Sequence, residues 1–419
     1  MKLDEMRKRL GSVELGRLYR DTERGRARLC AVISAFSAKY GERDDAMLLS
    51  APGRSEICGN HTDHNMGVAI AAAIDRDIIA VAAPRPDGKI RVQSEGRRED
   101  ALTVEAAGSP KNFPRYKSVG LIAGVVGGFM KRGYKVGGFD AYTMTEVLSG
   151  SGLSSSAAFE VMIGNILNHL YNGGRIDNKE IAKIAQYAEN VYFGKPSGLL
   201  DQMASAVGGF VYIDFGGEEV NVEPIDFSLE DAGYRLAIIG PLGSHADLGE
   251  DYASIPAEMK SVAAALGKRY MREVDEGALT AAIPTLRGRV SDRALLRALH
   301  FVRECGRVER MHAALIAGDM GEVLKLHRES GHSSFEYLQN VFTTKHADQG
   351  LSLAIALTDS YVYGKAASVR VHGGGFAGTV QALIPEELAA GYAEMIEHTF
   401  GKGACMLMSV RRAGAVRIL

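Results

Sequence analysis

Apolar residues recur along the chain at two spacings, one typical of amphipathic helices and the other of strands. Leu29, Ile33, Phe36 and Tyr40 fall at helical spacing, so we expect a helix that ends near Gly41. Further helices are expected over "AAFEVMIGNILNHLY" and "NKEIAKIAQYAENVYFG". Long helical stretches are expected from about residue 256 to residue 330.

Short apolar runs between these segments predict strands. "DIIAVAA" and "KIRVQSE" lie on either side of Pro86-Asp87-Gly88, which is typical of a tight turn, so we expect a β-hairpin there. "AMLLSAPG" is expected to be a short buried strand that ends in a turn at Pro52-Gly53. "FDAYTMTEV", "FVYIDF", "RLAIIG" and "CMLMSV" are strand-like, and "VRVHGGGFAGTVQALI" predicts strand, glycine loop and strand. Because no regular β-α-β period appears, we predict an α+β fold.

Length and composition narrow the class of protein. A chain of 419 residues is too long for one ordinary core, so we expect two domains, 1–218 and 219–419, divided near "GGEE". A net charge of −2 gives no reason to expect nucleic acid or an anionic membrane as partner. Four scattered cysteines, no signal peptide and no membrane-spanning run indicate a cytoplasmic protein. We expect a monomer or a weak homo-oligomer.

The stretch "LSGSGLSSSAAFE" predicts a phosphate-binding loop. Gly150 and Gly152 turn the chain after a strand, and Ser154, Ser155 and Ser156 begin a helix. Unpaired N–H groups at a helix N-terminus attract anions, and glycines let the backbone approach phosphate oxygens. A single serine would suffice to cap the helix, so a run of three favours phosphate binding over a simple cap. The loop lacks G-K-[ST] and is therefore not a Walker A loop.

A second glycine loop, "HGGGFAG", matches G-x-G-x-x-G from Gly373 to Gly378. The dinucleotide fingerprint needs a helix directly after these glycines, whereas Thr379–Ile384 alternates like a strand, so we reject that interpretation. A lipase oxyanion loop is also rejected, because the chain has no G-x-S-x-G elbow. A plain glycine-rich hairpin remains open on this evidence.

The polar stretch "GNHTDHNMG", residues 59–67, predicts a pocket for a hydroxyl-rich ligand. A loop of this kind does not provide the scaffold that zinc requires, but its donors and acceptors suit several hydroxyls. Arg54 lies just upstream, and Asp201 lies between apolar neighbours in "GLLDQMAS". A lone shielded aspartate is more often a cap or an ion-pair partner. An aspartate paired with an arginine near a phosphate loop can orient or receive a hydroxyl proton.

Together these motifs resemble the galactokinase branch of the GHMP small-molecule kinases. "APGRSEICGNHTDHNMG" is similar to the galactokinase signature, "VLSGSGLSSSAAFE" to the family's phosphate loop and "VRVHGGGFAGTV" to its third motif. "GLLDQ" matches the segment that carries the essential aspartate, and the order agrees from about residue 45 onward. The resemblance implies a two-domain α+β kinase in which ATP and sugar meet in the cleft between the domains.

The resemblance also implies roles for individual residues. Asp201 would be the catalytic or hydroxyl-orienting residue and Arg54 its partner, while Ser156 and Glu189 would hold Mg²⁺. The implied sugar contacts are Asn60, His61, Asp63, Gly198 and Tyr252. The implied ATP-binding residues are Gly150, Gly152, Leu153, Ser154, Ser155 and Ser156.

The implied reaction is ATP-dependent phosphorylation of the anomeric hydroxyl of galactose or a near relative. A non-catalytic sugar–ATP regulator and a kinase for a sugar altered at C6 are the alternatives. The chain departs from the family pattern at Asn60, where glutamate is usual, at His64, where tyrosine is usual, and at Ala377, where glycine is usual. The first two changes remove a negative charge from the pocket and add donors. They motivate the hypothesis of altered recognition at C6.

Overall fold

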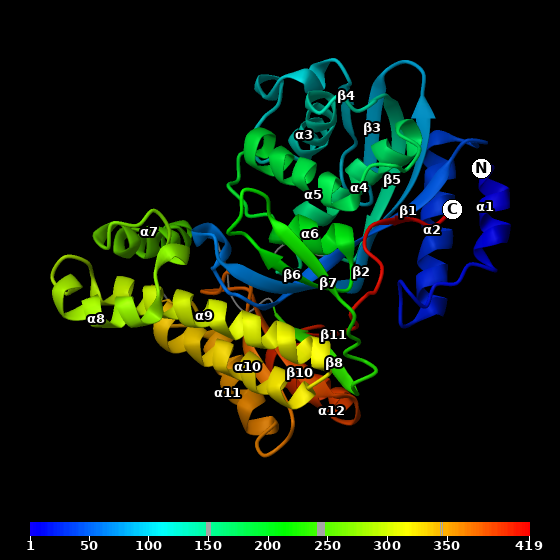
Figure 1. The fold of residues 1–419 in the computed structure, drawn as a ribbon. Helices are drawn as coiled ribbons and strands as arrows, with labels where there is room; N and C mark the ends of the chain where they lie inside the picture. The colour runs from blue at the N-terminus through cyan, green and yellow to red at the C-terminus, as the bar shows by residue number, and fades with distance from the viewer. Residues whose placement is uncertain (148–151, 241–247, 344, 346) are drawn as a thin grey trace.

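Two β-sheets, each covered by helices, make up the protein (Figure 1). The structure, a computed structural model, describes residues 1–147, 152–240, 248–343, 345 and 347–419. In these residues the larger sheet has eight strands, in the order β12-β1-β2-β5-β3-β4, with β6 and β7 added beside β2. The smaller sheet has the order β11-β8-β10-β9. The mixture of helices and mostly antiparallel strands confirms the α+β prediction.

The larger sheet is buried on both faces. Its strands are β1 (Met47–Cys58), β2 (Val68–Arg85), β3 (Lys89–Ser94), β4 (Asp100–Thr103), β5 (Gly138–Thr145), β6 (Phe210–Asp214), β7 (Asn221–Ile225) and β12 (Val416–Arg417). Along β2, Ile78 and Ala80 enter one core while Ile79 and Val81 enter another. Because successive side chains point to opposite faces, a strand covered on both sides is a continuous apolar run, as "DIIAVAA" is.

Two groups of helices provide these covers. α1 (Leu3–Leu10) and α2 (Thr22–Tyr40) pack on one face. The other face carries α3 (Ser118–Lys131), α4 (Ser155–Tyr171), α5 (Asn178–Tyr187) and α6 (Leu200–Val207). The predicted end of α2 before Gly41 and the predicted helices over α4 and α5 are confirmed.

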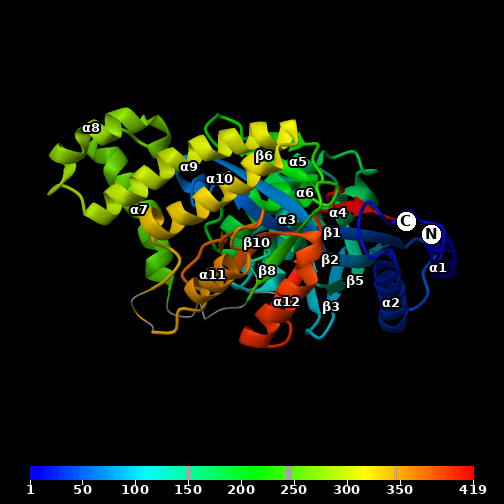
Figure 2. The same ribbon diagram turned by 90° about the horizontal axis from the view of Figure 1, so that it is seen from below.

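The smaller sheet consists of β8 (Tyr234–Ile239), β9 (Ser368–His372), β10 (Thr379–Pro385) and β11 (Cys405–Met408). α11 (Gly350–Tyr361) and α12 (Glu386–Phe400) pack on one of its faces. α7 (Gly249–Ala265), α8 (Glu276–Leu286), α9 (Asp292–Ala317) and α10 (Met320–Ser333) complete this part of the protein. α7 and α8 lie at the end of the molecule farthest from α1 and α2 (Figures 1 and 2). No helix among the described residues is both long enough and apolar enough to cross a membrane.

Two strand predictions are wrong. β1 does not end in a turn at Pro52-Gly53 but continues to Cys58, with an irregularity in its pairing between Pro52 and Arg54. A bulge of this kind accommodates a proline inside a sheet. β2 and β3 are joined by the expected turn but do not form a hairpin, because β5 lies between them and pairs with both.

The division expected between residues 218 and 219 falls inside the connection from β6 to β7. These two strands pair with each other, so the larger sheet extends to Ile225. The end of the chain also returns to this sheet, where β12 pairs with β1. The split into domains 1–218 and 219–419 therefore stays a prediction. The larger sheet contains strands from both sides of that boundary.

Candidate functional site

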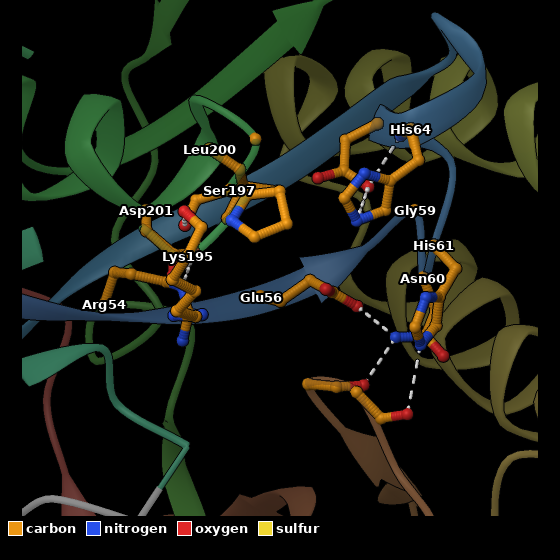
Figure 3. A pocket seen from close by; sticks show the side chains of 15 residues that line it. Arg54, Glu56, Gly59, Asn60, His61, His64, Lys195, Ser197, Leu200 and Asp201 are labelled. Carbon is orange, nitrogen blue, oxygen red and sulfur yellow. Dashed lines mark hydrogen bonds and ion pairs between the residues drawn. The ribbon is translucent and has the colours of Figure 1, made fainter. Parts of the chain in front are cut away.

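A polar cavity of about 250 Å³ lies where the larger sheet meets the β9–β10 glycine loop (Figure 3). Four segments line it: β1, the polar loop after β1, the segment before and into α6, and the glycine loop. The lining residues are Arg54, Glu56, Gly59, Asn60, His61, Asp63, His64, Lys195, Pro196, Ser197, Gly198, Leu200, Asp201, Gly373 and Gly374. The cavity therefore joins the polar loop and the aspartate-containing segment that the sequence analysis singled out.

Arg54 and Asp201 form an ion pair at one side of this cavity. Arg54 Nε donates to Asp201 Oδ1 at 2.6 Å, and Arg54 also donates to the carbonyl oxygen of Gly152. The Ser154 hydroxyl donates to Asp201 Oδ2. Asp201 lies in the first turn of α6, and its side chain is 25% exposed. The predicted pair is thus in contact, and it touches the predicted phosphate loop.

The contacts of Asp201 keep its carboxylate ionised. Burial alone would raise the pKa of Asp201, but the charge of Arg54 and the hydrogen bonds from Arg54 and Ser154 outweigh it, so the pKa is lowered. An ionised carboxylate accepts hydrogen bonds and cannot donate them. Asp201 can therefore accept a hydrogen bond from a ligand hydroxyl and orient that hydroxyl.

The described part of the predicted phosphate loop packs against the smaller sheet. α4 begins at Ser155, and Ser154 before it adopts a left-handed conformation with φ of 62°. A Cβ atom on Gly152 would lie 2.7 Å from Thr379 Oγ1, so only glycine fits there without displacement. Leu153 is buried and Ser156 is half-buried. Gly150 lies outside the described residues.

The carboxylate of Glu189 accepts from three side chains beside the start of α4. The Ser156 hydroxyl donates to Glu189 Oε1 at 2.8 Å, and Lys195 Nζ lies 3.1 Å from the same oxygen. Gln202 Nε2 donates to Glu189 Oε2 at 2.8 Å and to buried Glu160 at 3.2 Å. Burial, followed by the charge of Glu189, raises the pKa of Glu160 well above its usual range. The two predicted metal residues, Ser156 and Glu189, are therefore adjacent.

The polar loop between β1 and β2 is closed by its own side chains. The buried Thr62 hydroxyl lies 2.9 Å from the carbonyl oxygen of Gly59 and 2.7 Å from that of Val68. A Cβ atom on Gly67 would lie 2.6 Å from Thr62 Cβ, so the loop requires glycine at this position. Thr62 thus fixes the loop from inside and leaves its neighbours to face the cavity.

His61, Asp63 and Gly198 lie together in the cavity wall. A Cβ atom on Gly198 would lie 2.2 Å from Asp63 Oδ2, so the absence of a side chain makes room for this carboxylate. His61 Nε2 donates to the carbonyl oxygen of Gly374 at 3.0 Å. Burial lowers the pKa of His61, which keeps the ring neutral. These three predicted sugar contacts are therefore gathered at one site.

Two other predicted sugar contacts are engaged elsewhere. Asn60 borders the cavity but is only 1% exposed, and its amide donates to Glu56 Oε1 at 2.9 Å and to the carbonyl oxygen of Gly373 at 2.7 Å. Tyr252, on α7, donates its hydroxyl to the carbonyl oxygen of Gly375 at 2.7 Å. It is not among the described residues that line the cavity. Both side chains hold the glycine loop.

Glu56 and Lys195 also line the cavity, although no motif in the sequence predicted them as site residues. Glu56 lies two residues after Arg54 on β1, and side chains two residues apart on a strand share a face. The sequence spacing could therefore have predicted that Glu56 lies beside Arg54 in the site. Lys195 lies six residues before Asp201 in an irregular segment, where no periodicity predicts its direction. The loss of a negative charge inferred from Asn60 is offset by the carboxylate of Glu56.

Comparison with known proteins identifies the class to which this fold and site belong. The family model described as "GHMP kinases N terminal domain" matches residues 120–209, which include the predicted phosphate loop. The model described as "Galactokinase galactose-binding signature" matches residues 34–84, which include the polar loop. The crystal structure of Lactococcus lactis galactokinase complexed with galactose superposes with a TM-score of 0.80 at 21% identity, covering 93% of this chain and all of that one. The fold is that of the GHMP kinases.

Two relatives place the chain within that class. The galactokinase of Streptomyces coelicolor is 31% identical over 398 residues, which are 92% of this chain and 97% of that protein. The galactokinase of Mycobacterium tuberculosis is 32% identical over 354 residues, 83% of this chain and 91% of that protein. The chain belongs to the galactokinase family. The resemblance recognised in the motifs is thereby confirmed.

Proposed function

We propose that the protein is a sugar 1-kinase, which transfers the γ-phosphoryl group of ATP to the anomeric hydroxyl of galactose or a closely related sugar. The observation that carries the proposal is the Arg54–Asp201 ion pair, which faces the cavity and contacts Ser154 and Gly152 of the predicted phosphate loop. A hydroxyl in the cavity would thus lie beside both a hydrogen-bond acceptor and the nucleotide's phosphates.

In the proposed reaction the sugar hydroxyl oxygen forms a bond to the γ-phosphorus as the bond to the bridging oxygen of ADP breaks. Asp201 orients the hydroxyl and receives its proton, and Arg54 offsets the charge that develops on the phosphoryl oxygens. Transition states of this reaction are loose, so positioning and electrostatics supply most of the catalysis. Two fixed donors on Asp201 provide such positioning.

The start of α4 supports binding of the nucleotide's phosphates. Ser154, Ser155 and Ser156 lie at the N-terminus of a 17-residue helix, where unpaired N–H groups favour anions. Ser156 and Glu189 supply the oxygen donors that Mg²⁺ prefers. When bound, Mg²⁺ would neutralise charge on the β- and γ-phosphates. Lys195 contributes a further positive charge beside Ser156 and Glu189.

The test is release of ADP from ATP and Mg²⁺ over a panel of monosaccharides. We expect release that depends on added sugar, with galactose or a near relative preferred. ³¹P NMR of the product should identify a phosphate on the anomeric oxygen. A non-catalytic regulator would bind ATP and sugar without releasing ADP. Release that is independent of sugar, or a product phosphorylated at another hydroxyl, would contradict the proposal.

A further inference from the structure

Asn60 has no hydrogen-bonding capacity left for a ligand on its donor side. Its two amide hydrogens are used by Glu56 Oε1 and by the carbonyl oxygen of Gly373. Its Oδ1 accepts from Asn340 Nδ2 at 2.7 Å, and its backbone carbonyl accepts from His300 Nε2 at 3.0 Å. At 1% exposure the side chain is a buried connection between β1 and the glycine loop.

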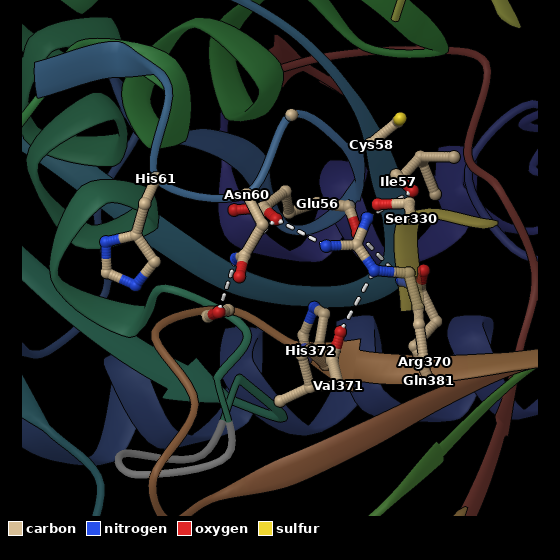
Figure 4. A network of polar contacts seen from close by, with 12 residues as sticks. Glu56, Ile57, Cys58, Asn60, His61, Ser330, Arg370, Val371, His372 and Gln381 are labelled. Carbon is tan, nitrogen blue, oxygen red and sulfur yellow. Dashed lines mark hydrogen bonds and ion pairs between the residues drawn. The ribbon is translucent and has the colours of Figure 1, made fainter. Parts of the chain in front are cut away.

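Glu56, unlike Asn60, keeps hydrogen-bonding capacity for a ligand. Its Oε1 accepts from Asn60 and, at 3.2 Å, from Nη2 of buried Arg370, as Figure 4 shows. Arg370 is itself held in place because Nη1 donates to the carbonyl oxygen of Ile57 at 2.7 Å. Glu56 Oε2 accepts no hydrogen bond from any residue that the structure describes, although Glu56 lines the cavity. One oxygen is thus anchored and the other is available to a ligand.

Strand geometry sets the position of Glu56 relative to the reacting centre. Arg54, Ser55 and Glu56 pair with β2 in unbroken register, so the side chains of Arg54 and Glu56 share a face of β1. Their Cα atoms lie about 6.5 Å apart, which is two residues of strand rise. Asp201 is held by Arg54. Figure 3 shows Glu56 beyond Arg54 along β1, so a sugar whose reacting hydroxyl lies at Asp201 would extend its ring toward Glu56.

We propose that Glu56 binds the sugar hydroxyl farthest from the phosphorylated one, and that Asn60 is a positioning residue that fixes Glu56 and the glycine loop. This inference rests on the proposed sugar kinase function. Glu56 Oε2 lacks a donor among the described residues, and burial raises the pKa of Glu56 despite the charge of Arg370 and the hydrogen bond from Asn60. A sugar hydroxyl supplies one. The distal end of the pocket keeps a carboxylate, in residue 56 instead of residue 60.

The experiment compares kcat/KM for galactose, 4-deoxygalactose and 6-deoxygalactose in the wild type, Glu56→Gln and Asn60→Ala. A pocket built around a hydroxyl rejects the analogue that lacks it by on the order of 10⁴. For one deoxy sugar we expect Glu56→Gln to shrink the galactose preference at least about tenfold, because a charge-assisted hydrogen bond is lost. Asn60→Ala should lower kcat/KM for all three sugars by a similar factor and leave that preference intact.

Glu56→Asp is the second variant, because it keeps a charge for Arg370 but withdraws the carboxylate from the cavity. It should shrink the same preference if Glu56→Gln does not fold. The proposal is overturned if Asn60→Ala removes the preference while the Glu56 variants retain it, or if no variant changes it. If the wild type turns over no sugar, the proposed function fails. The same ratios, taken from calorimetric sugar affinities, then decide the role of Glu56.

Discussion

Asp201 is held by donors on both of its oxygens, so its charge can be changed with little change of shape. Replacing Asp201 with asparagine should lower kcat by at least about 10²–10⁴, the usual contribution of a positioned acid–base group. The variant should remain folded and bind ATP, because Arg54 keeps its hydrogen bond to the carbonyl oxygen of Gly152. The measurement is steady-state ADP release together with thermal unfolding and nucleotide titration.

The control for this substitution is Asp231→Asn, which makes the same chemical change at an ion pair on the surface. Asp231 lies 2.8 Å from Arg412, and both side chains are mostly exposed. Turnover of this variant should match the wild type. If Asp201→Asn also retained activity within a few-fold, Asp201 would have no role in the proton transfer.

His300 lies beneath the polar loop and is expected to make stability depend on pH. Its Nε2 donates to the carbonyl oxygen of Asn60 at 3.0 Å, and in the neutral ring its Nδ1 accepts from the Ser333 hydroxyl at 2.9 Å. Burial lowers the pKa of His300 to about 4. The unfolded chain takes up this proton near pH 6.5, so acid favours unfolding.

The contribution of His300 is fully present above about pH 6.5, is lost as the pH falls towards 4, and changes no further below that. The full loss is about 3 kcal/mol. Urea unfolding of the wild type and His300→Gln at pH 7.5 and pH 5 measures it. The variant should lose less free energy of unfolding between these pH values than the wild type. Equal losses would show that His300 is not held neutral.

At the scale of elements, the start of α4 and the π-helical turn Ala188–Phe193 bring Ser156 and Glu189 together. Glu189→Gln should raise the Mg²⁺ concentration for half-maximal activity by on the order of 10- to 100-fold, since loss of a charged contact weakens metal binding by about that much. Lys195→Met should shift it in the opposite direction, because the ammonium group shares Glu189 Oε1 with Ser156.

Both shifts are read from magnesium titrations of ADP release at saturating ATP and sugar. Lys325→Met, at an exposed lysine on α10, is the control for the loss of a positive charge and should leave the titration unchanged. An unchanged titration in Glu189→Gln would remove Glu189 from the site. A Lys195→Met titration shifted upward would mean that Lys195 assists the metal instead of competing with it.

The same elements show why local patterns predicted helices better than sheets. The helical spacing of Leu29, Ile33 and Phe36 lies within one segment, and it correctly predicted α2. The hairpin predicted around Pro86 was wrong because the partner of both strands, β5, lies some fifty residues further along the chain. Strand pairing depends on such distant segments, and a turn residue carries no information about them.

In the candidate site too, local motifs predicted some contacts, while contacts with distant segments decided others. Arg54, Asp201 and Ser156 lie in motifs whose chemistry is visible over a few residues, and the structure brings each into contact with its expected neighbour. Asn60 and Tyr252 lie in such motifs too, but their side chains bond to the glycine loop, which is distant in sequence. A motif indicates which residues are near the site, whereas only the tertiary contacts decide which of them face it.

At the scale of the whole molecule, a buried charge cluster joins three distant parts of the chain. Asp77 of β2 accepts from Arg28 of α2 at 2.8 Å and from Arg411, which follows β11, at 3.1 Å. The hydroxyls of Tyr19 and Ser50 donate to Asp77 at 2.5 Å. Burial would raise the pKa of Asp77, but Arg28 and Arg411 outweigh it and lower it. Asp77 and Arg411 are both fully buried, so neither charge can be solvated alone.

This cluster fixes the segment that returns from the smaller sheet to the larger one, where the chain ends beside its own start (Figure 1). Asp77→Asn should lower the free energy of unfolding by about 3–5 kcal/mol, because it leaves Arg411 buried without a counter-charge. Arg411→Met should cost a similar amount, and the double variant less than the sum of the two, since the partners are coupled. Urea unfolding followed by circular dichroism suits a chain without tryptophan. A loss below about 1 kcal/mol, the cost at an exposed ion pair, would mean that the returning segment is held by its strand pairing alone.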